Sequence, residues 1–301
     1  MDAVIGLGAA GCNIADQFAK YPQYKVYKID VGLESLNDLS GIVLDDADDN
    51  VKTFSMPLQL TSEDYEKNCP SMKTFFEELK EGDNVLFIVG GGGRIAGASL
   101  RILETIKDCK LSVMYVKPDL QLMGGKKYIL DRISYYVLQE YARSGMFERM
   151  YLTYNPSIEN VVGDISIKGY FEELNKTVVS TVHMINVFDN TTPIFENRSE
   201  PENHVRISTH GVVDPETGEE SLFFPLKDIT DKVYYIAVNK EVLEDKEFFK
   251  ELKDNMRKKA EQDGVSVSYV INETEYEDSY VYVVAHSEEI QQEEELTKKQ
   301  E

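Results

Sequence analysis

Residues 85–99, with the sequence VLFIVGGGGRIAGAS, restrict the possible folds of this chain more than any other stretch. A continuous apolar run ends in the four glycines 90–93, and helical spacing follows at Leu100, Ile102, Leu103 and Ile106. The pattern predicts a buried strand, a glycine loop and a helix in succession. Glycines lack a Cβ atom, so their N–H groups can approach a ligand, and the positive end of the helix dipole favours an anion such as phosphate. We therefore interpret the loop as a phosphate site, with a flexible linker as the alternative.

A second glycine motif lies near the start of the chain. The apolar residues 3–5 lead into GLGAAGCN at residues 6–13, and a predicted helix follows. In this position a GxGxxG motif is typical of dinucleotide binding, because its glycines make the turn, admit phosphate and let the helix pack on the strand. Asp30 ends the next predicted strand at the spacing of a ribose ligand. These residues alone leave an NAD-dependent Rossmann oxidoreductase as one interpretation.

Strands and helices alternate along the first half of the chain. Strands are predicted at 25–30, 51–54, 111–116 and 150–154, and a helix at 62–80 with an interruption at Pro70. A further helix is predicted at 128–141, with Ile129, Ile133, Tyr136 and Val137 on its apolar side. This order predicts an α/β fold with a doubly wound parallel sheet, which binds ligands at the carboxyl ends of its strands.

The pattern changes after a long amphipathic helix at 170–187. Strands are then predicted at 205–208, 222–224, 233–238, 265–271 and 280–285, with a charged helix at 246–262. We expect a nucleotide-binding domain at 1–168, a central helix at 169–188, a smaller α/β domain at 189–286 and an acidic tail at 287–301. The tail has almost no apolar periodicity, so we expect it to be solvated.

Charge and cysteine content limit the partners and the compartment. The formal net charge is −22, which disfavours direct binding to nucleic acid or to an anionic membrane and is compatible with a basic protein partner. The three cysteines have no CxxC spacing, and the first residues lack the basic region of a secretory signal. We therefore expect reduced thiols and a cytoplasmic location.

The order of these motifs over residues 3–286 resembles the FtsZ/tubulin family. Residues 6–13 are similar to the family's GxGGxGxN, and GGGGRIAGA stands where the family has GMGGGTGTGA. Within that second loop Arg94, Ile95 and Ala96 replace Thr, Gly and Thr. Lys117-Pro118 is similar to the start of the family's Lys-Pro-Phe, Asn155 to the asparagine of its Pro-Asn-Asp turn, and residues 171–175 to its Phe-x-x-Ala-Asp.

The resemblance implies a protein that binds GTP between two glycine loops and assembles head to tail into filaments with copies of itself. Mg²⁺ would be bound chiefly through the nucleotide and water. The aromatic ring of Phe171 would stack on guanine, and Asn175 would read the edge of the base. The residues that the resemblance assigns to the nucleotide are Gly6, Gly8, Ala9, Ala10, Gly11, Cys12, Asn13, Gly91, Gly92, Gly93, Arg94, Ala96, Gly97, Asn155, Phe171 and Asn175.

Several departures from the family pattern limit what the resemblance implies. Residues 45–80 contain no third glycine-rich loop, and residues 123–126 replace the ribose-contacting Glu-Gly-Arg segment. The loop at 193–202 contains Glu196, Glu200 and Glu202 but no alignable catalytic pattern, so we assign no catalytic residue and expect GTP hydrolysis to be weak or lost. The pattern favours a divergent relative of plasmid or phage type. A second interpretation is a tubulin-fold structural or assembly protein that binds no nucleotide.

Overall fold

The fold is described from a computed structural model, which places residues 1–32, 42–44, 50–199 and 201–293. Glu200 of the predicted hydrolysis loop and residues 294–301 of the predicted tail lie outside the described residues. Within the described ranges, no helix is both long and apolar enough to cross a membrane.

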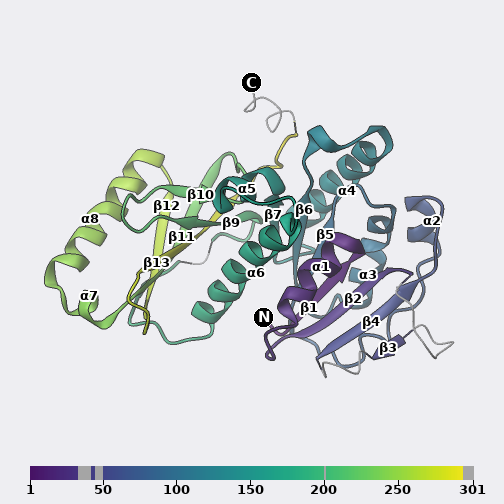
Figure 1. The fold of residues 1–301 in the computed structure, drawn as a ribbon, viewed down its shortest axis with the longest axis horizontal. Helices are drawn as coiled ribbons and strands as arrows, with labels where there is room; N and C mark the ends of the chain where they lie inside the picture. Colours follow the sequence, from purple (N-terminus) through teal and green to yellow (C-terminus); the bar gives the residue numbers. More distant parts are fainter. Residues whose placement is uncertain (33–41, 45–49, 200, 294–301) are drawn as a thin grey trace.

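One mixed sheet of 13 strands runs through the described chain (Figure 1). Its first half has the order β3-β4-β2-β1-β5-β6-β7, and every pair in it is parallel except β3 with β4. The apolar runs of the sequence form these strands because both faces of a parallel sheet are buried. The strands are β1 (Ala3–Leu7), β2 (Lys25–Val31), β3 (Ile42–Leu44), β4 (Val51–Met56), β5 (Asn84–Gly90), β6 (Lys110–Lys117) and β7 (Arg149–Tyr154).

Helices cover both faces of this half. Successive side chains of a strand point to opposite faces, so Ala3, Ile5 and Leu7 of β1 join one core cluster and Val4 joins another. Packed on the Val4 side are α1 (Gly8–Phe18), α5 (Asn155–Val162) and α6 (Tyr170–Asp189). The opposite side holds α2 (Ser62–Lys67), the 3₁₀ turn η1 (Arg94–Ala98), α3 (Ser99–Thr105) and α4 (Gly125–Arg143), with a second short 3₁₀ turn, η2 (Leu120–Leu122), before α4.

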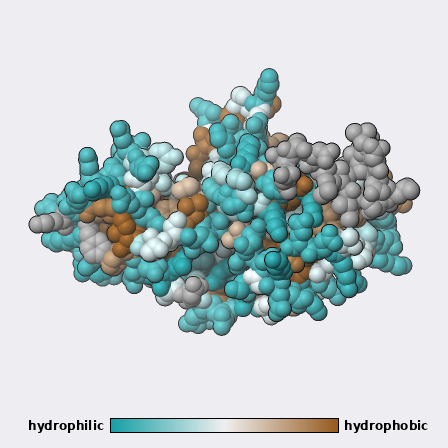
Figure 2. All heavy atoms as spheres, turned by 90° about the horizontal axis from the view of Figure 1, so that it is seen from below, coloured by the Kyte–Doolittle hydropathy of each residue, from teal (hydrophilic) through white to brown (hydrophobic). Residues whose placement is uncertain are grey.

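The second half continues the same sheet. β7 and β9 pair in parallel through Met150 with Ile207 and Tyr151 with Ser208, so the sheet crosses the predicted domain boundary. β9 (Ile207–Val213), β13 (Tyr280–Ser287), β11 (Ile229–Val238), β12 (Ser266–Glu273) and β8 (Phe195–Asn197) follow in that spatial order, and β10 (Glu220–Leu222) pairs with β9. α7 (Lys240–Glu244) and α8 (Lys246–Asp263) contribute apolar side chains to the cluster on one face of this half. Hydrophilic residues cover most of the molecular face in Figure 2, as the charge of the chain requires.

Three sequence-based expectations are wrong. The helix that starts at Ser62 ends at Lys67, and turns follow, because Pro70 stops it. The predicted apolar side of α4 faces outward: Ile129, Ile133 and Val137 are exposed, whereas the helix buries Asp131, Tyr135, Leu138, Gln139 and Ala142. The predicted solvated tail begins with buried residues, since Gln291 and Glu293 are 3% and 4% exposed.

The first helix lies so close to the sheet that only glycine fits at their contact. A Cβ atom at Gly11 would overlap the carbonyl oxygen of Ile88 in β5. We expect Gly11→Ala to lower the free energy of unfolding by about 2–3 kcal/mol, because neither backbone can move without disturbing the sheet. Urea denaturation measures the change. Gly124→Ala is the control, since a Cβ there meets no atom within 4 Å; equal midpoints for the two variants would contradict this packing.

Candidate functional site at the carboxyl edge of the sheet

The two glycine loops follow neighbouring parallel strands. β1 ends at Leu7 and β5 at Gly90, and these two strands pair directly, so both loops leave the same edge of the sheet. α6 places its beginning near this edge. The last turns of α6 line a cavity together with Asn84 and Lys110, the first residues of β5 and β6, so the helix runs from the carboxyl edge to the amino edge.

The first glycine loop forms the N-terminus of α1, where backbone N–H groups are left without a capping side chain. α1 begins at Gly8 directly after β1, and no side chain caps it, so its first N–H groups have no side-chain partner. Ala9, Ala10 and Asn13 are exposed, whereas Gly8, Gly11 and Cys12 are buried. Gly6 is also buried, and a Cβ atom there would overlap the carbonyl group of Gly11. This loop can present backbone donors to an anion at the edge.

Cys12 belongs to the interior of the first loop. Its Sγ lies 3.4 Å from the carbonyl oxygen of Gly6 and 3.5 Å from that of Ile29. Burial, with the nearby carboxylate of Asp30 as a second cause, raises the pKa of the Cys12 thiol to about 12. The thiol therefore stays protonated and unreactive at neutral pH.

In the second loop, the space above the glycines is occupied by the protein itself. A Cβ atom at Gly91 would overlap Asp131 Oδ1, one at Gly97 would overlap the backbone of Ser62, and one at Gly92 would lie 2.5 Å from Met123 Cε. Ile95, which is buried beside Ala96, approaches the first loop, and its Cγ2 would lie 2.9 Å from a Cβ at Gly8. Close packing therefore accounts for these glycines without a ligand.

Gly93 and Arg94 form the exposed part of this loop. They line a cavity of about 520 Å³ together with Lys126 and Lys127, which start α4. The Arg94, Lys126 and Lys127 side chains are exposed, and none of them is ion-paired with another described residue. α4 has no capping side chain and no acidic residue in its first turn. Three cations and a helix start thus line one cavity in a chain of net charge −22, and its other side is lined by Glu63 and by the apolar side chains of Leu60, Ile129 and Leu130.

Lys127 was not among the residues expected from the sequence, and Lys126 was noted only as a departure from the family pattern. The signal that points to them is the GGKK sequence at 124–127, in which two glycines start a helix and two lysines follow in its first turn. A helix N-terminus that carries cations is favourable for an anionic ligand.

The remaining expected residues lie on α5 and α6. Asn155 is the first residue of α5, follows β7 directly and is half-buried. Phe171 lies in the first turn of α6 and is 63% exposed, which contradicts a core role for its ring. Asn175 is half-buried one turn later, on the same side of the helix as Phe171. The structure thus presents an aromatic ring and an amide together near the carboxyl edge.

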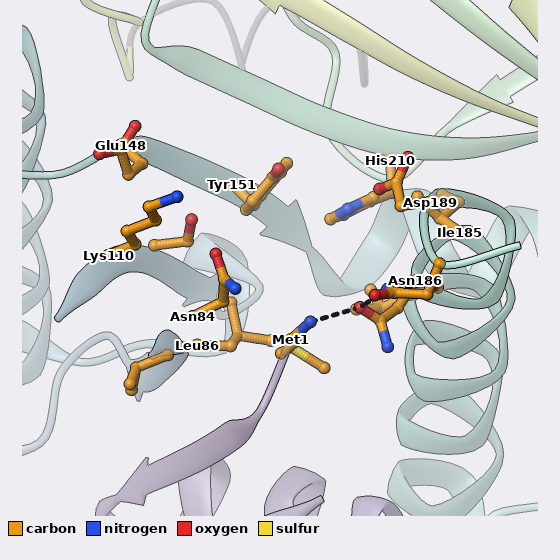
Figure 3. A pocket seen from close by; sticks show the side chains of 14 residues that line it. Met1, Asn84, Leu86, Lys110, Glu148, Tyr151, Ile185, Asn186, Asp189 and His210 are labelled. Carbon is orange, nitrogen blue, oxygen red and sulfur yellow. Dashed lines mark hydrogen bonds between the residues drawn. The ribbon is translucent and has the colours of Figure 1, made fainter. Parts of the chain in front are cut away.

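A second cavity, of about 480 Å³, lies at the opposite edge and contains none of the expected site residues (Figure 3). The terminal amine of Met1 donates a hydrogen bond to Asn186 Oδ1 there, at 2.7 Å. His210 stacks on Tyr151 with ring centroids 4.3 Å apart, and burial lowers the pKa of its imidazole to about 3. Among the described residues, no group of three His, Cys, Asp or Glu side chains is placed to hold a metal ion.

The parallel sheet with its two glycine loops, the long helix α6 and the second α/β half define a tubulin/FtsZ-like fold, which confirms the fold class predicted from the sequence. Among solved structures, an empty FtsZ dimer from M. jannaschii matches with a TM-score of 0.68 at 11% identity, over 95% of this chain and 87% of that chain. A GTPγS-form TubZ protofilament from Bacillus thuringiensis serovar israelensis matches with a TM-score of 0.66 at 15% identity, over 99% and 91%.

CetZ2 from Haloferax volcanii, in a GTPγS-bound protofilament, matches with a TM-score of 0.67 at 14% identity, over 99% of this chain and 96% of that chain. No protein-family model matches the sequence, and no curated protein matches it significantly. At these identities the likeness to solved structures shows the fold.

Proposed function

We propose that this protein binds GTP at the carboxyl edge of its sheet and assembles head to tail with copies of itself into filaments. The observation that carries the proposal is the exposed Phe171 ring beside Asn175, near the edge where the first turn of α1 has no side-chain cap. Phe171 would stack on the base and Asn175 would bind its polar edge. The α1 N–H groups would hold phosphate, and Mg²⁺ would bind through the phosphates and water.

The cations at Arg94, Lys126 and Lys127 support the phosphate end of this proposal. In the sequence Arg94 replaces a threonine of the family pattern, so a guanidinium stands where a hydroxyl donor is lost. An arginine donates to phosphate in a bidentate manner, which compensates for that loss. The TubZ and CetZ2 neighbours are GTPγS forms, which is consistent with nucleotide binding by a protein of this fold.

The course of α6 supports head-to-tail assembly. The helix starts near the proposed nucleotide edge and ends at the opposite edge of the sheet. The chain then continues from that opposite edge into β8, which contains Glu196. A contact between the nucleotide edge of one subunit and the opposite edge of the next joins two different surfaces, so it produces an open filament. Glu196 is exposed and Glu202 lies in the same connection, so either carboxylate is available to a neighbouring subunit. We assign neither as catalytic and expect slow hydrolysis.

The net charge of −22 favours a basic protein as a further partner.

The second candidate function is a filament or assembly protein without nucleotide. The position of Ile95 over Gly8 favours it, because an apolar side chain approaches the first loop where phosphate would bind. No observation favours the NAD-dependent oxidoreductase. Asp30, on which that interpretation depends, accepts a hydrogen bond from the N–H of Val31 at 2.7 Å.

A calorimetric titration of nucleotide-stripped protein with GTP and Mg²⁺, with NAD as the comparison ligand, tests the proposal. We expect GTP to bind and Phe171→Ala to weaken binding at least about fivefold, because stacking of one base on an aromatic ring contributes about 1–3 kcal/mol. Tyr276→Ala is the control, since Tyr276 is also an exposed aromatic residue, on the β12–β13 connection. Folded protein that binds neither ligand yet still pellets as filaments would establish the nucleotide-free candidate instead.

A further inference from the structure

The segment that follows β13 is docked along α4. Residues 291–293, which we call the docked segment, include the buried side chains of Gln291 and Glu293. The N–H of Gln291 donates to Gln139 Oε1 at 2.8 Å, and the N–H of Glu293 donates to the Tyr136 hydroxyl at 3.1 Å. The docked segment therefore passes from the later turns of α4 toward the start of the helix.

Glu293 enters a buried group of charges. Lys117 Nζ donates to Glu293 Oε1 at 2.8 Å and to Asp131 Oδ2 at 2.6 Å, and Lys117 is fully buried. One ammonium group thus serves two carboxylates. The second oxygen of Glu293, Oε2, is buried without a hydrogen-bond partner among the described residues. The ion pair with Lys117 holds Glu293 in place, but two carboxylates share one ammonium, so the buried group keeps an excess negative charge and is destabilised by further negative charge nearby.

Asp131 connects this group to the central glycine loop. Its Oδ1 occupies the space where a Cβ of Gly91 would lie and accepts a hydrogen bond from the Tyr115 hydroxyl at 2.7 Å. Gly91 donates its N–H to the carbonyl of Val116, the residue before Lys117, at 3.0 Å. A continuous series of contacts therefore leads from the glycine loop through Asp131 and Lys117 to Glu293.

From this series of contacts we infer that the docked segment is an autoinhibitory latch on the glycine loop. An anion held at Gly93 and Arg94 and the carboxylate of Glu293 both add negative charge around the same Asp131–Lys117 pair, so each disfavours the other. Anion binding releases the segment, and release of the segment strengthens anion binding by the same factor. The inference rests on the proposed function, because it gives that site its regulation.

Hydrogen exchange of the full chain tests whether Glu293 holds the segment. We expect Glu293→Gln to speed exchange at the amides of Gln291 and Glu293 at least about fivefold. The variant leaves Lys117 paired with Asp131, so no buried cation loses all its partners. Tyr136→Phe removes the hydroxyl that accepts from Glu293 without altering the buried charges, and it serves as a second variant. Glu289→Gln is the control, because Glu289 is an exposed carboxylate two residues before the docked segment. Unchanged exchange in both test variants would overturn the latch.

The coupling is measured with inorganic tripolyphosphate, which needs only the anion site, and then with GTP and Mg²⁺. We expect Glu293→Gln to bind tripolyphosphate at least about fivefold more tightly than the wild type, and bound tripolyphosphate to speed exchange of the docked segment in the wild type. Equal affinities in wild type, Glu293→Gln and Glu289→Gln would overturn the latch while leaving the nucleotide site intact. Failure of all three folded proteins to bind tripolyphosphate and GTP would overturn the proposed function and the latch together.

Discussion

Lys117→Met is expected to lower the free energy of unfolding by about 3–5 kcal/mol at neutral pH. The substitution removes the ammonium that pairs with Asp131 and Glu293 and leaves two carboxylates buried without a counterion. Burial raises the pKa of the Asp131 carboxyl even with Lys117 beside it, which shows how strongly this interior disfavours negative charge. Urea denaturation, followed by circular dichroism, measures the loss.

Two further variants separate the buried charge from the lost side chain. Lys110→Met changes an exposed lysine at the start of the same strand and should shift stability by less than about 0.5 kcal/mol. Adding Asp131→Asn and Glu293→Gln to Lys117→Met removes both unpaired carboxylates and should recover most of the loss. A Lys117→Met protein as stable as the Lys110→Met control would contradict the proposed charge balance.

Acidification from pH 7 to pH 5 is expected to remove about 4 kcal/mol of stability through His210 and His286 alone. Burial lowers the pKa of both imidazoles to about 3, and for His286 the positive charge of Arg149 adds to the effect. In the unfolded chain both titrate near 6.5. Between these values the unfolded state binds up to two more protons than the folded state. The contribution of the two histidines to the free energy of unfolding is therefore fully present above about pH 6.5 and is lost as the pH decreases toward 3.

The histidine contribution is isolated by a difference between variants, because other groups also titrate in this range. His210→Phe keeps a ring against Tyr151 and removes one of the two protonation sites, so its stability should fall by about 2 kcal/mol less than that of the wild type between pH 7 and pH 5. Parallel profiles for wild type and His210→Phe would show that His210 accepts a proton in the folded state.

Prediction from the sequence succeeded where burial follows one repeating pattern. The runs that form β1, β5, β6 and β7 are buried on both faces, and a continuous apolar stretch of strand length indicates such a strand. α6 buries Leu174, Val178, Val182 and Ile185, the same spacing that identified it as amphipathic. The two glycine loops reach a common edge because the strands before them are parallel neighbours.

Prediction failed for α4, where polar side chains form the buried face. Asp131 and Gln139 face inward because Lys117 and Gln291 supply their partners, and Ile129, Ile133 and Val137 are left exposed. A hydrophobic pattern cannot identify such a face, since buried polar groups are stabilised by specific hydrogen bonds and not by apolar area. Lys126 and Lys127 were likewise not predicted as site residues, because their approach to Arg94 depends on how α4 sits beside the loop.

The sequence by itself determined the main buried strands, the two glycine loops, the long helix and the tubulin/FtsZ-like class of fold, because each depends on residues that are neighbours along the chain. Only the tertiary structure decided which glycines are required by packing, which side of α4 is buried and where residues 291–293 lie. Those features depend on contacts between distant residues, such as Lys117 with Glu293, 176 positions apart. Local periodicity carries no information about contacts at that separation, since they arise only when the whole chain is folded.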